Sequence, residues 1–304
     1  MQIVFGPILS RRFGVSLGVD LSPYAKQCNF DCVYCELEAK KPMDTQTQIA
    51  PVEIIIESIK NALVIHPDIN VLTFTANGEP TLYPHLETLI LQVKELLKEY
   101  PAIKTLILSN GSLFQAQKNA LNHFDIVKFS LDSAVAKHFK RVDKPSKTLD
   151  LSTIKQGIKE FSKQYHGELV AEVLIVASMN DDIESNKESA AFLREIDIKR
   201  VDISTIDRPS SHRVYPVSNE KLYELSTLYE GLNICVVTRK NDTLKLVQQE
   251  IQEIEILELL KRRPLTHADC EILLTKASVK RLENMLVAGQ IKIKNIAGVS
   301  FYCV

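Results

Sequence analysis

The sequence has little of what defines several common protein classes. No apolar run reaches the ~18–20 residues needed to cross a membrane, so an integral membrane protein is not expected. Six cysteines in 304 residues are too few for a disulfide framework. The opening run MQIVFGPILSRRFGV lacks the long apolar segment and small-residue cleavage site of a secretory signal. We therefore expect a cytoplasmic protein without a membrane partner, whose thiols stay reduced.

Composition and charge are typical of a globular chain with two unequal parts. Hydrophobic residues make up 45% and charged residues 25% of the sequence. The formal net charge of −1 implies no overall attraction to nucleic acid. A polar, turn-prone run, RKNDT, lies at residues 239–243. We therefore expect a core domain over residues 1–240 and a small second domain over residues 241–304.

Strand-like and helix-like segments alternate through the expected core domain. Short runs rich in Val, Ile and Leu are typical of strands buried on both faces of a parallel sheet. The expected strands are Ser16–Leu21, Asn70–Thr75, Lys104–Leu108, Ile126–Leu131, Leu169–Val176, Arg200–Ile206 and Ile234–Val237. The expected helices are Val52–Ile65, Pro84–Tyr100, Leu113–Ala120, Leu151–Tyr165, Ser185–Glu195 and Asn219–Tyr229. Repeated β–α units predict an α/β fold whose parallel sheet is open or closed into a barrel.

Polar and glycine-containing runs follow successive strands at their carboxyl ends, where parallel folds gather their active sites. The first expected strand leads into three closely spaced cysteines, and the second leads into the run NGEP at residues 77–80. The run SNG at 109–111 follows the third strand, Ser130 and Asp132 close the fourth, and DRP at 207–209 follows the sixth. We therefore expect these residues to converge on one rim of the sheet.

The three cysteines, Cys28, Cys32 and Cys35, form a CxxxCxxC run. Iron–sulfur clusters are normally held by four thiolates, so three predict a cubane with one open iron. The small molecule that this spacing suggests for the open iron is S-adenosylmethionine. A structural zinc site is the alternative, but it usually needs four ligands, often as two CxxC pairs. The sequence has no second pair and no histidine beside the motif.

The spacing and surroundings of these cysteines closely resemble the radical S-adenosylmethionine (SAM) superfamily. The resemblance implies a partial (β/α)6-type parallel barrel and a 4Fe–4S cluster on Cys28, Cys32 and Cys35. It also implies reductive cleavage of SAM to a 5′-deoxyadenosyl radical, hydrogen abstraction from a substrate, and an external one-electron donor such as flavodoxin. The SAM-binding positions carried over by motif are Tyr34, Gly78, Glu79, Asn110, Ser130 and Asp132.

Each of these positions has a role that the resemblance suggests. Tyr34 would pack near the adenine, and Gly78 would let the backbone approach the cofactor closely. Glu79 would accept a charge-assisted hydrogen bond from the cofactor ammonium. Asn110, Ser130 and Asp132, which lie at the ends of the next two strands, would contact the ribose or the carboxylate of the cofactor. Their alternative role is to cap strand ends, because Ser, Asn and Asp favour turns.

Longer runs resemble one branch of the superfamily, the bacterial proteins related to wyosine synthases. These runs are GPILSRRFG at 6–14, SLGVD at 16–20 and RVDKP at 141–145. Wyosine synthases are tRNA-modifying enzymes with an additional N-terminal cysteine set, whereas no cysteine precedes Cys28 here, so no auxiliary cluster is expected. Arg11, Arg12 and Arg208 are candidate substrate-binding residues, since arginine grips phosphate or carboxylate with two hydrogen bonds. A salt-bridged surface is the alternative.

The last part of the chain has its own pattern. Three expected helices, at 248–261, 266–273 and 276–288, precede strand-like runs at 290–294 and 299–303, an order that resembles a winged-helix domain. Thr266 and Asp269 fit a helix N-cap and first turn. Residues 261–304 carry eight Lys or Arg and three Asp or Glu residues, and Ser278, Lys280 and Arg281 lie on the expected recognition helix. Such domains bind nucleic acid largely through contacts to its phosphates, although many bind protein instead.

Two functions from different classes are consistent with the sequence. The first is a radical SAM enzyme acting on RNA, such as tRNA, or on another substrate recruited by the C-terminal domain. The second is an iron–sulfur redox sensor whose winged helix binds DNA. Reductive cleavage of SAM distinguishes them, because only the enzyme would carry it out.

Overall fold

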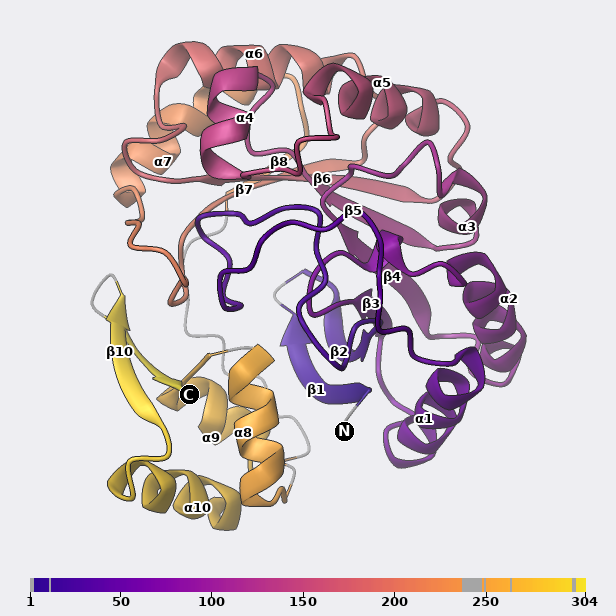
Figure 1. Cartoon of the computed structure of the whole chain (residues 1–304), viewed down its shortest axis with the longest axis vertical. Helices are drawn as coiled ribbons and strands as arrows, with labels where there is room; N and C mark the ends of the chain where they lie inside the picture. Colours follow the sequence, from indigo (N-terminus) through magenta and orange to yellow (C-terminus); the bar gives the residue numbers. More distant parts are fainter. Residues whose placement is uncertain (1–2, 11, 237–247, 249, 263, 297–298) are drawn as a thin grey trace.

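The protein is built around one curved sheet of eight strands. The computed structural model describes residues 3–10, 12–236, 248, 250–262, 264–296 and 299–304. The strands follow one another across the sheet in sequence order, from β1 to β8. β1 is antiparallel to β2, and every later neighbouring pair is parallel. The predicted α/β fold with a mostly parallel sheet is confirmed (Figure 1).

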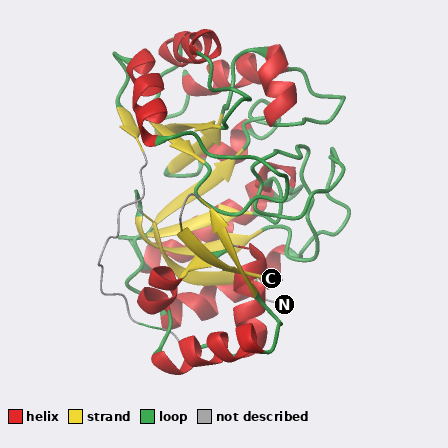
Figure 2. Ribbon diagram, turned by 90° about the vertical axis from the view of Figure 1, so that its left-hand side faces the viewer, coloured by secondary structure: helices red, strands yellow, loops and turns green. Residues whose placement is uncertain are grey.

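The elements of this core alternate along the chain. The strands are β1 Val4–Ser10, β2 Gly14–Asp20, β3 Val71–Thr75, β4 Lys104–Ser109, β5 Ile126–Ser130, β6 Glu168–Ile175, β7 Arg200–Thr205 and β8 Ile234–Val236. The helices are α1 Val52–Ile65, α2 Leu86–Leu96, α3 Lys118–Asn122, α4 Ala136–Val142, α5 Leu151–Ser162, α6 Ile183–Arg194 and α7 Asn219–Ser226. In Figure 2 the strands run through the middle of the molecule, with helices toward both ends of the view.

Most expected elements overlap the observed ones, and one helix is displaced. The helix expected over Leu113–Ala120 begins instead at Lys118, because residues 113–117 form turns. In these turns the buried Phe114 ring packs edge-on against Phe129 and Phe161. Val237 and the expected linker at 239–243 lie outside the described residues.

Two core elements were not expected, β1 and the short helix α4. Gly6 and Pro7 interrupt β1, and its pairing with β2 shifts between Phe5 and Ile8. Proline is tolerated in an edge strand at such a bulge, because an edge strand can lose a ladder hydrogen bond. The Gly-Pro pair therefore hides the strand from an analysis of hydrophobic runs. α4 is hidden for another reason, since it is short and buries only Phe139 and Val142.

The sheet encloses a cavity of about 590 Å³. Every second side chain of a strand faces it, as Thr73 and Thr75 of β3 do, while the intervening Phe74 packs in the outer core. At the amino ends of the strands, four aliphatic side chains close the interior around the ring of Phe13; they are Val71, Leu106, Ile126 and Val170. The cavity therefore extends toward the carboxyl ends, where the rim residues were expected.

A second, smaller unit follows the core. Its elements are α8 Glu253–Arg262, β9 Leu265–Thr266, α9 His267–Leu273, α10 Lys276–Val287, β10 Lys292–Ile296 and β11 Val299–Cys303. Thr266 caps α9 and exchanges hydrogen bonds with Asp269 in a capping box, which confirms the expected N-cap. α8 begins at Glu253 rather than at residue 248. Three helices and a hairpin appear in the predicted order, and β9 adds a third strand; the winged-helix assignment stays a prediction.

Among the described residues, the small unit contacts the core at β1 and at the loop after β7. Pro7 and Ile8 of β1 face Leu259 and Leu274 across a shallow cleft, and Figure 1 shows α8 beside β1. The loop after β7 makes the second contact, where Lys294 Nζ donates to the Ser210 carbonyl at 3.1 Å. None of the helices in the described ranges is both long enough and apolar enough to span a membrane.

Replacing Leu89 with alanine is expected to lower the free energy of unfolding by roughly 2–5 kcal/mol, because its fully buried side chain would leave a cavity between α2 and the sheet. Leu91→Ala is the matched control, since Leu91 lies on the same helix and is 48% exposed. It should change the free energy by no more than about 0.5 kcal/mol. Urea unfolding followed by circular dichroism measures both. Equal losses of unfolding free energy in the two variants would contradict the assignment of the Leu89 side of α2 as its buried face.

Candidate active site

The cysteine loop begins just beyond β2 and is fixed by the buried amide of Gln27. Gln27 Oε1 accepts a hydrogen bond from the Thr47 backbone N–H at 2.7 Å, and its Nε2 donates to Ser22 Oγ at 2.7 Å. Asp20, the last residue of β2, accepts from the backbone N–H groups of Ser22 and Asn77 at 2.8 and 2.9 Å. These bonds tie the loop to the end of the next strand. Sequence patterns did not single out Gln27 or Asp20.

Cys28, Cys32 and Cys35 all line the cavity and are partly buried. Burial, with the nearby Glu79 charge, raises the pKa of Cys28 to about 12. Burial also raises the pKa values of Cys32 and Cys35. The thiolates therefore need a positive centre beside them, and an iron–sulfur cluster supplies one. The donor set fits such a cluster.

The described residues contain no preformed site for a single metal ion at the cysteines. Within the described ranges, no three His, Cys, Asp or Glu side chains surround one metal-ion position.

Gly78 permits a close approach between the cysteine loop and the end of β3. Its φ is +138°, and a Cβ atom there would lie 1.9 Å from the Gln27 carbonyl oxygen. The two residues form a parallel bridge, in which the Glu79 N–H donates to that carbonyl at 3.0 Å. The sequence argument assigned this glycine to approach of the cofactor. The structure adds a second reason, because the backbone of the cysteine loop occupies the space of a side chain; the approach to the cofactor stays a prediction.

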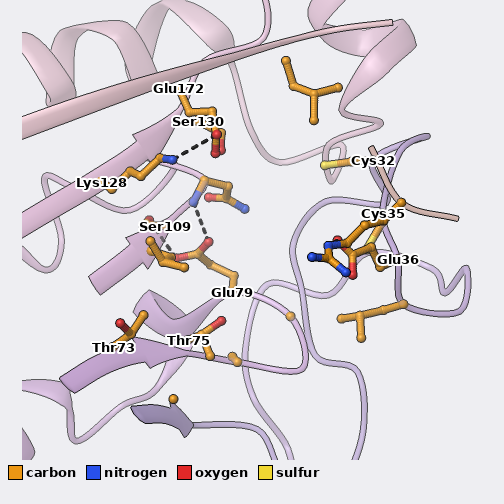
Figure 3. A pocket seen from close by; sticks show the side chains of 18 of the residues that line it. Cys32, Cys35, Glu36, Thr73, Thr75, Glu79, Ser109, Lys128, Ser130 and Glu172 are labelled. Atoms are coloured by element: carbon orange, nitrogen blue, oxygen red, sulfur yellow. Dashed lines mark hydrogen bonds and ion pairs between the residues drawn. The ribbon is translucent and has the colours of Figure 1, made fainter. Parts of the chain in front are cut away.

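Glu79 is fully buried, and its carboxylate is engaged by the protein itself. Oε1 accepts from the Thr81 hydroxyl at 2.5 Å and from Ser109 Oγ at 2.8 Å, and Oε2 accepts from the Asn110 N–H at 2.7 Å. Burial nevertheless raises the pKa of Glu79 above its usual range. Figure 3 shows Glu79 held between Ser109 and the neighbouring strand end. The carboxylate thus orients the ends of β3 and β4, and its contact with a cofactor ammonium stays a prediction.

Asn110 lines the cavity and joins β4 to the cysteine loop. Its Nδ2 donates to Asn29 Oδ1 at 2.7 Å, and its Oδ1 accepts from Ser112 Oγ at 2.6 Å. Asn29, which is buried within the cysteine motif, also donates to Ser112 at 2.7 Å. Asn110 therefore positions the loop, whatever further contact it makes. Asn29 was missed because asparagine in a loop is a common turn residue.

Tyr34 and Ser130 line the cavity, whereas Asp132 lies behind them. The Tyr34 hydroxyl donates to Asp132 Oδ2 at 2.5 Å, and the Leu174 N–H donates to the other oxygen at 2.8 Å. Burial raises the pKa of Asp132 to about 6, although the bond from Tyr34 opposes that rise. The geometry makes Asp132 a support for the tyrosine ring. It does not bring the carboxylate to the cavity wall, where direct cofactor contact was expected.

The two candidate arginines among the described residues, Arg12 and Arg208, lie at different ends of the barrel. Arg11 lies outside the described residues. Arg12 enters from the β1–β2 turn at the amino end of the strands. Its guanidinium lies 3.1 Å from Glu172 and 3.2 Å from Asp202. Arg208 lies on the cavity wall, in the loop after β7, as expected.

The loop after β7 links the cysteine motif to the small C-terminal unit. The Ser211 N–H donates to the Cys35 carbonyl at 2.9 Å, and His212 lies 3.2 Å from Asp31. Arg208 lies 3.7 Å from Glu36 and donates a hydrogen bond to the Pro264 carbonyl. The loop after β7, which was the sixth expected strand, therefore contacts the CxxxCxxC motif itself.

Two of the three candidate residues on the expected recognition helix, α10, form their contacts within the small unit. Ser278 is fully buried and accepts from the Ile251 N–H at 2.7 Å. Arg281 donates to the Ile251 carbonyl at 3.1 Å and lies 2.9 Å from Glu250. Lys280 is 71% exposed and is 3.5 Å from Glu283. Of the three candidate residues, Lys280 is therefore the one whose side chain lies at the surface.

Gly78→Ala is expected to prevent cluster assembly, since its methyl group would collide with backbone rather than with a flexible side chain. Iron content and the visible absorption spectrum after anaerobic reconstitution measure the effect. Gly157→Ala is the matched control, because a Cβ atom at this helical position meets its nearest neighbour at 3.5 Å, an ordinary contact. A Gly78→Ala protein with the parent's iron content would refute the role of the close approach.

Comparisons with known proteins identify the family of the chain. Residues 22–193 fit the model of the Radical SAM superfamily. A UPF0026 protein from Helicobacter pylori is 50% identical over 305 residues, which cover 99% of this chain and 97% of that protein. A UPF0026 protein from Methanocaldococcus jannaschii is 30% identical over 289 residues, covering 92% of this chain and 88% of its own length.

Solved structures show the same fold at low identity. TYW1 with a lysine-pyruvate adduct bound is 17% identical, with a TM-score of 0.51 over 71% of this chain and 74% of that chain. A radical SAM methyltransferase from Sphaerobacter thermophilus is 13% identical, with a TM-score of 0.57 over 73% of this chain and 66% of that chain. Superfamily membership does not favour the redox-sensor alternative. The chain belongs to the Radical SAM superfamily, together with the UPF0026 proteins.

Proposed function

We propose that this protein is a radical enzyme that holds a 4Fe–4S cluster on Cys28, Cys32 and Cys35 and cleaves SAM reductively. The observation that carries the proposal is that these cysteines, within the segment that matches the superfamily, line one cavity at the carboxyl ends of the strands. When bound, the cluster and SAM supply the electron transfer and the 5′-deoxyadenosyl radical that takes hydrogen from a substrate.

The chain's own residues orient the reactants and exclude water. Gln27 and Gly78 hold the cysteine loop against β3, and Asn29 holds it against β4. Tyr34 and Ser130 offer a ring and a hydroxyl to the cofactor from the cavity wall. The aliphatic closure around Phe13 blocks the amino end of the barrel. Such closure protects a reactive intermediate from side reactions.

The electron source in this proposal is an external one-electron donor such as flavodoxin. No cysteine precedes Cys28 in the sequence. The remaining cysteines lie apart from the motif, with Cys235 on β8 and Cys270 and Cys303 buried in the small unit.

RNA, such as tRNA, is the proposed substrate class. The excess of basic residues over 261–304 supports it, and the exposed lysines of this segment are Lys261, Lys276, Lys280, Lys292 and Lys294. The small unit also reaches the rim through Lys294 and Ser210. An RNA bound there would lie next to the cavity mouth.

Anaerobically reconstituted and reduced protein is expected to convert SAM to 5′-deoxyadenosine, and Cys32→Ala should abolish the product, because three thiolates are needed to hold the cluster. Mass spectrometry of the nucleoside measures it. Cys235→Ala is the matched control and should retain the product, since Cys235 lies on β8 outside the cavity lining. A parent protein that holds an intact cluster yet neither binds nor cleaves SAM would refute the proposal.

Lys280→Gln is expected to weaken binding of transfer RNA and to reduce the slope of log affinity against log salt by roughly 0.7–0.9, the value for one lost phosphate contact. Filter binding over a series of salt concentrations measures both. Lys98→Gln is the matched control, because Lys98 is also 71% exposed and pairs with a glutamate three residues away. Identical slopes for the two variants would contradict RNA contact at α10.

A further inference from the structure

Four charged side chains form a layer inside the barrel. Lys128 on β5 lies 2.9 Å from Glu172 on β6 and 3.1 Å from Asp202 on β7. Arg12 lies 3.1 and 3.2 Å from the same two carboxylates. We call these four residues the inner charge layer. Figure 3 shows Lys128 and Glu172 facing the cavity from the strands, across from Cys32 and Cys35.

The inner charge layer is accessible from the cavity. Arg12, Lys128 and Glu172 line it, and Asp202 is fully buried behind them. Beneath the layer lies the aliphatic closure around Phe13, and the Arg200 guanidinium stacks on that ring at 5.2 Å while it bonds Asp202 at 2.8 Å. A ligand therefore reaches the layer through the carboxyl-end rim, past the cysteines.

Packing alone does not account for these charges. The cost of desolvating two ions often exceeds their mutual attraction, and apolar residues of similar volume frequently give a more stable protein. Parallel barrels commonly fill such layers with Val, Ile and Leu, as this barrel does one layer below. A buried charged layer at a cavity is thus more characteristic of a binding site than of a structural filler.

The layer has hydrogen-bonding capacity that its ion pairs leave unused. Both cations meet the same oxygen of Glu172, Oε1, and the other oxygen has no recorded partner among the described residues. That side chain is 25% exposed, toward the cavity. The Lys128 ammonium has three N–H donors for two carboxylate contacts. Burial alone would raise the pKa of Glu172, but the charges of Lys128 and Arg12 hold it below its usual range.

We propose that the inner charge layer binds a substrate group of the α-amino acid type, with its carboxylate against Lys128 and Arg12 and its ammonium against Glu172. The proposal rests on the proposed function, because it adds a substrate subsite to the same cavity. The layer presents both signs of charge, which a zwitterion complements without leaving a buried charge unpaired. A phosphate dianion would instead be repelled by Glu172, whose carboxylate lines the cavity beside both cations.

The test uses the whole protein, reconstituted with its cluster and saturated with SAM but left unreduced, so that SAM occupies the open iron. Glycine, acetate and inorganic phosphate are titrated into it and binding is measured by calorimetry. Glycine is expected to bind at least about tenfold more tightly than acetate, which lacks the ammonium, and than phosphate.

Two variants and a control locate the binding. Lys128→Met should weaken glycine binding by at least about tenfold, because it removes one carboxylate partner. Glu172→Gln, which keeps the side-chain shape, should remove the preference for glycine over acetate. Lys104→Met is the matched control, since Lys104 on neighbouring β4 forms a largely exposed pair with Glu168 and should leave binding unchanged. If Lys128→Met fails to fold, the isosteric Glu172→Gln decides the test.

Two results would overturn the proposal: no glycine binding by the SAM-saturated parent, or equal glycine binding by the parent and Glu172→Gln. Reduction of the same parent preparation and assay of 5′-deoxyadenosine tests the proposed function separately. If glycine binds through the inner charge layer but no 5′-deoxyadenosine forms, the proposed function alone is contradicted. If 5′-deoxyadenosine forms but glycine does not bind, the subsite alone is contradicted.

Discussion

The site depends on one close backbone contact, between Gln27 at the start of the cysteine loop and Gly78 at the end of β3. Only a residue without a Cβ atom fits there, because the Gln27 carbonyl occupies the space of that atom. The contact sets the height of the loop above the strands. Glu79 and Asn110 then continue the same network to β4. The cysteines are therefore positioned by the parallel sheet rather than by their own short loop.

The barrel interior is organised in layers of different chemistry. An aliphatic closure lies at the amino end, the inner charge layer lies above it, and hydroxyl and amide groups from the strand ends lie at the rim with the cysteines. This order follows from the period of two along each strand, which turns residues such as Ile126, Lys128 and Ser130 toward the same space. The loop after β7 and the small unit border the rim, so a large substrate and a small one would approach from the same side.

Much of this arrangement could be predicted from the sequence. Buried apolar runs identified seven parallel strands, and the CxxxCxxC run identified the cysteines that line the cavity. The bulged strand β1 could not be predicted, because Gly6 and Pro7 break its pattern and its pairing is settled only by contact with β2. The pairing of Asn29 with Asn110 and of Arg12 with Glu172 joins residues far apart in the chain, which no local pattern reveals. Lys128, a lone cation in the apolar run IVKFSL, was the one available signal of the inner charge layer.

The central claim is that the three cysteines hold a cubane with one iron left for SAM. Mössbauer spectroscopy of the iron-loaded protein, recorded before and after addition of SAM, tests it most directly. The account predicts the signature of a 4Fe–4S cluster in which a single iron changes its isomer shift when SAM is added. A mononuclear iron signal, or a cluster whose irons are all unaffected by SAM, would contradict it.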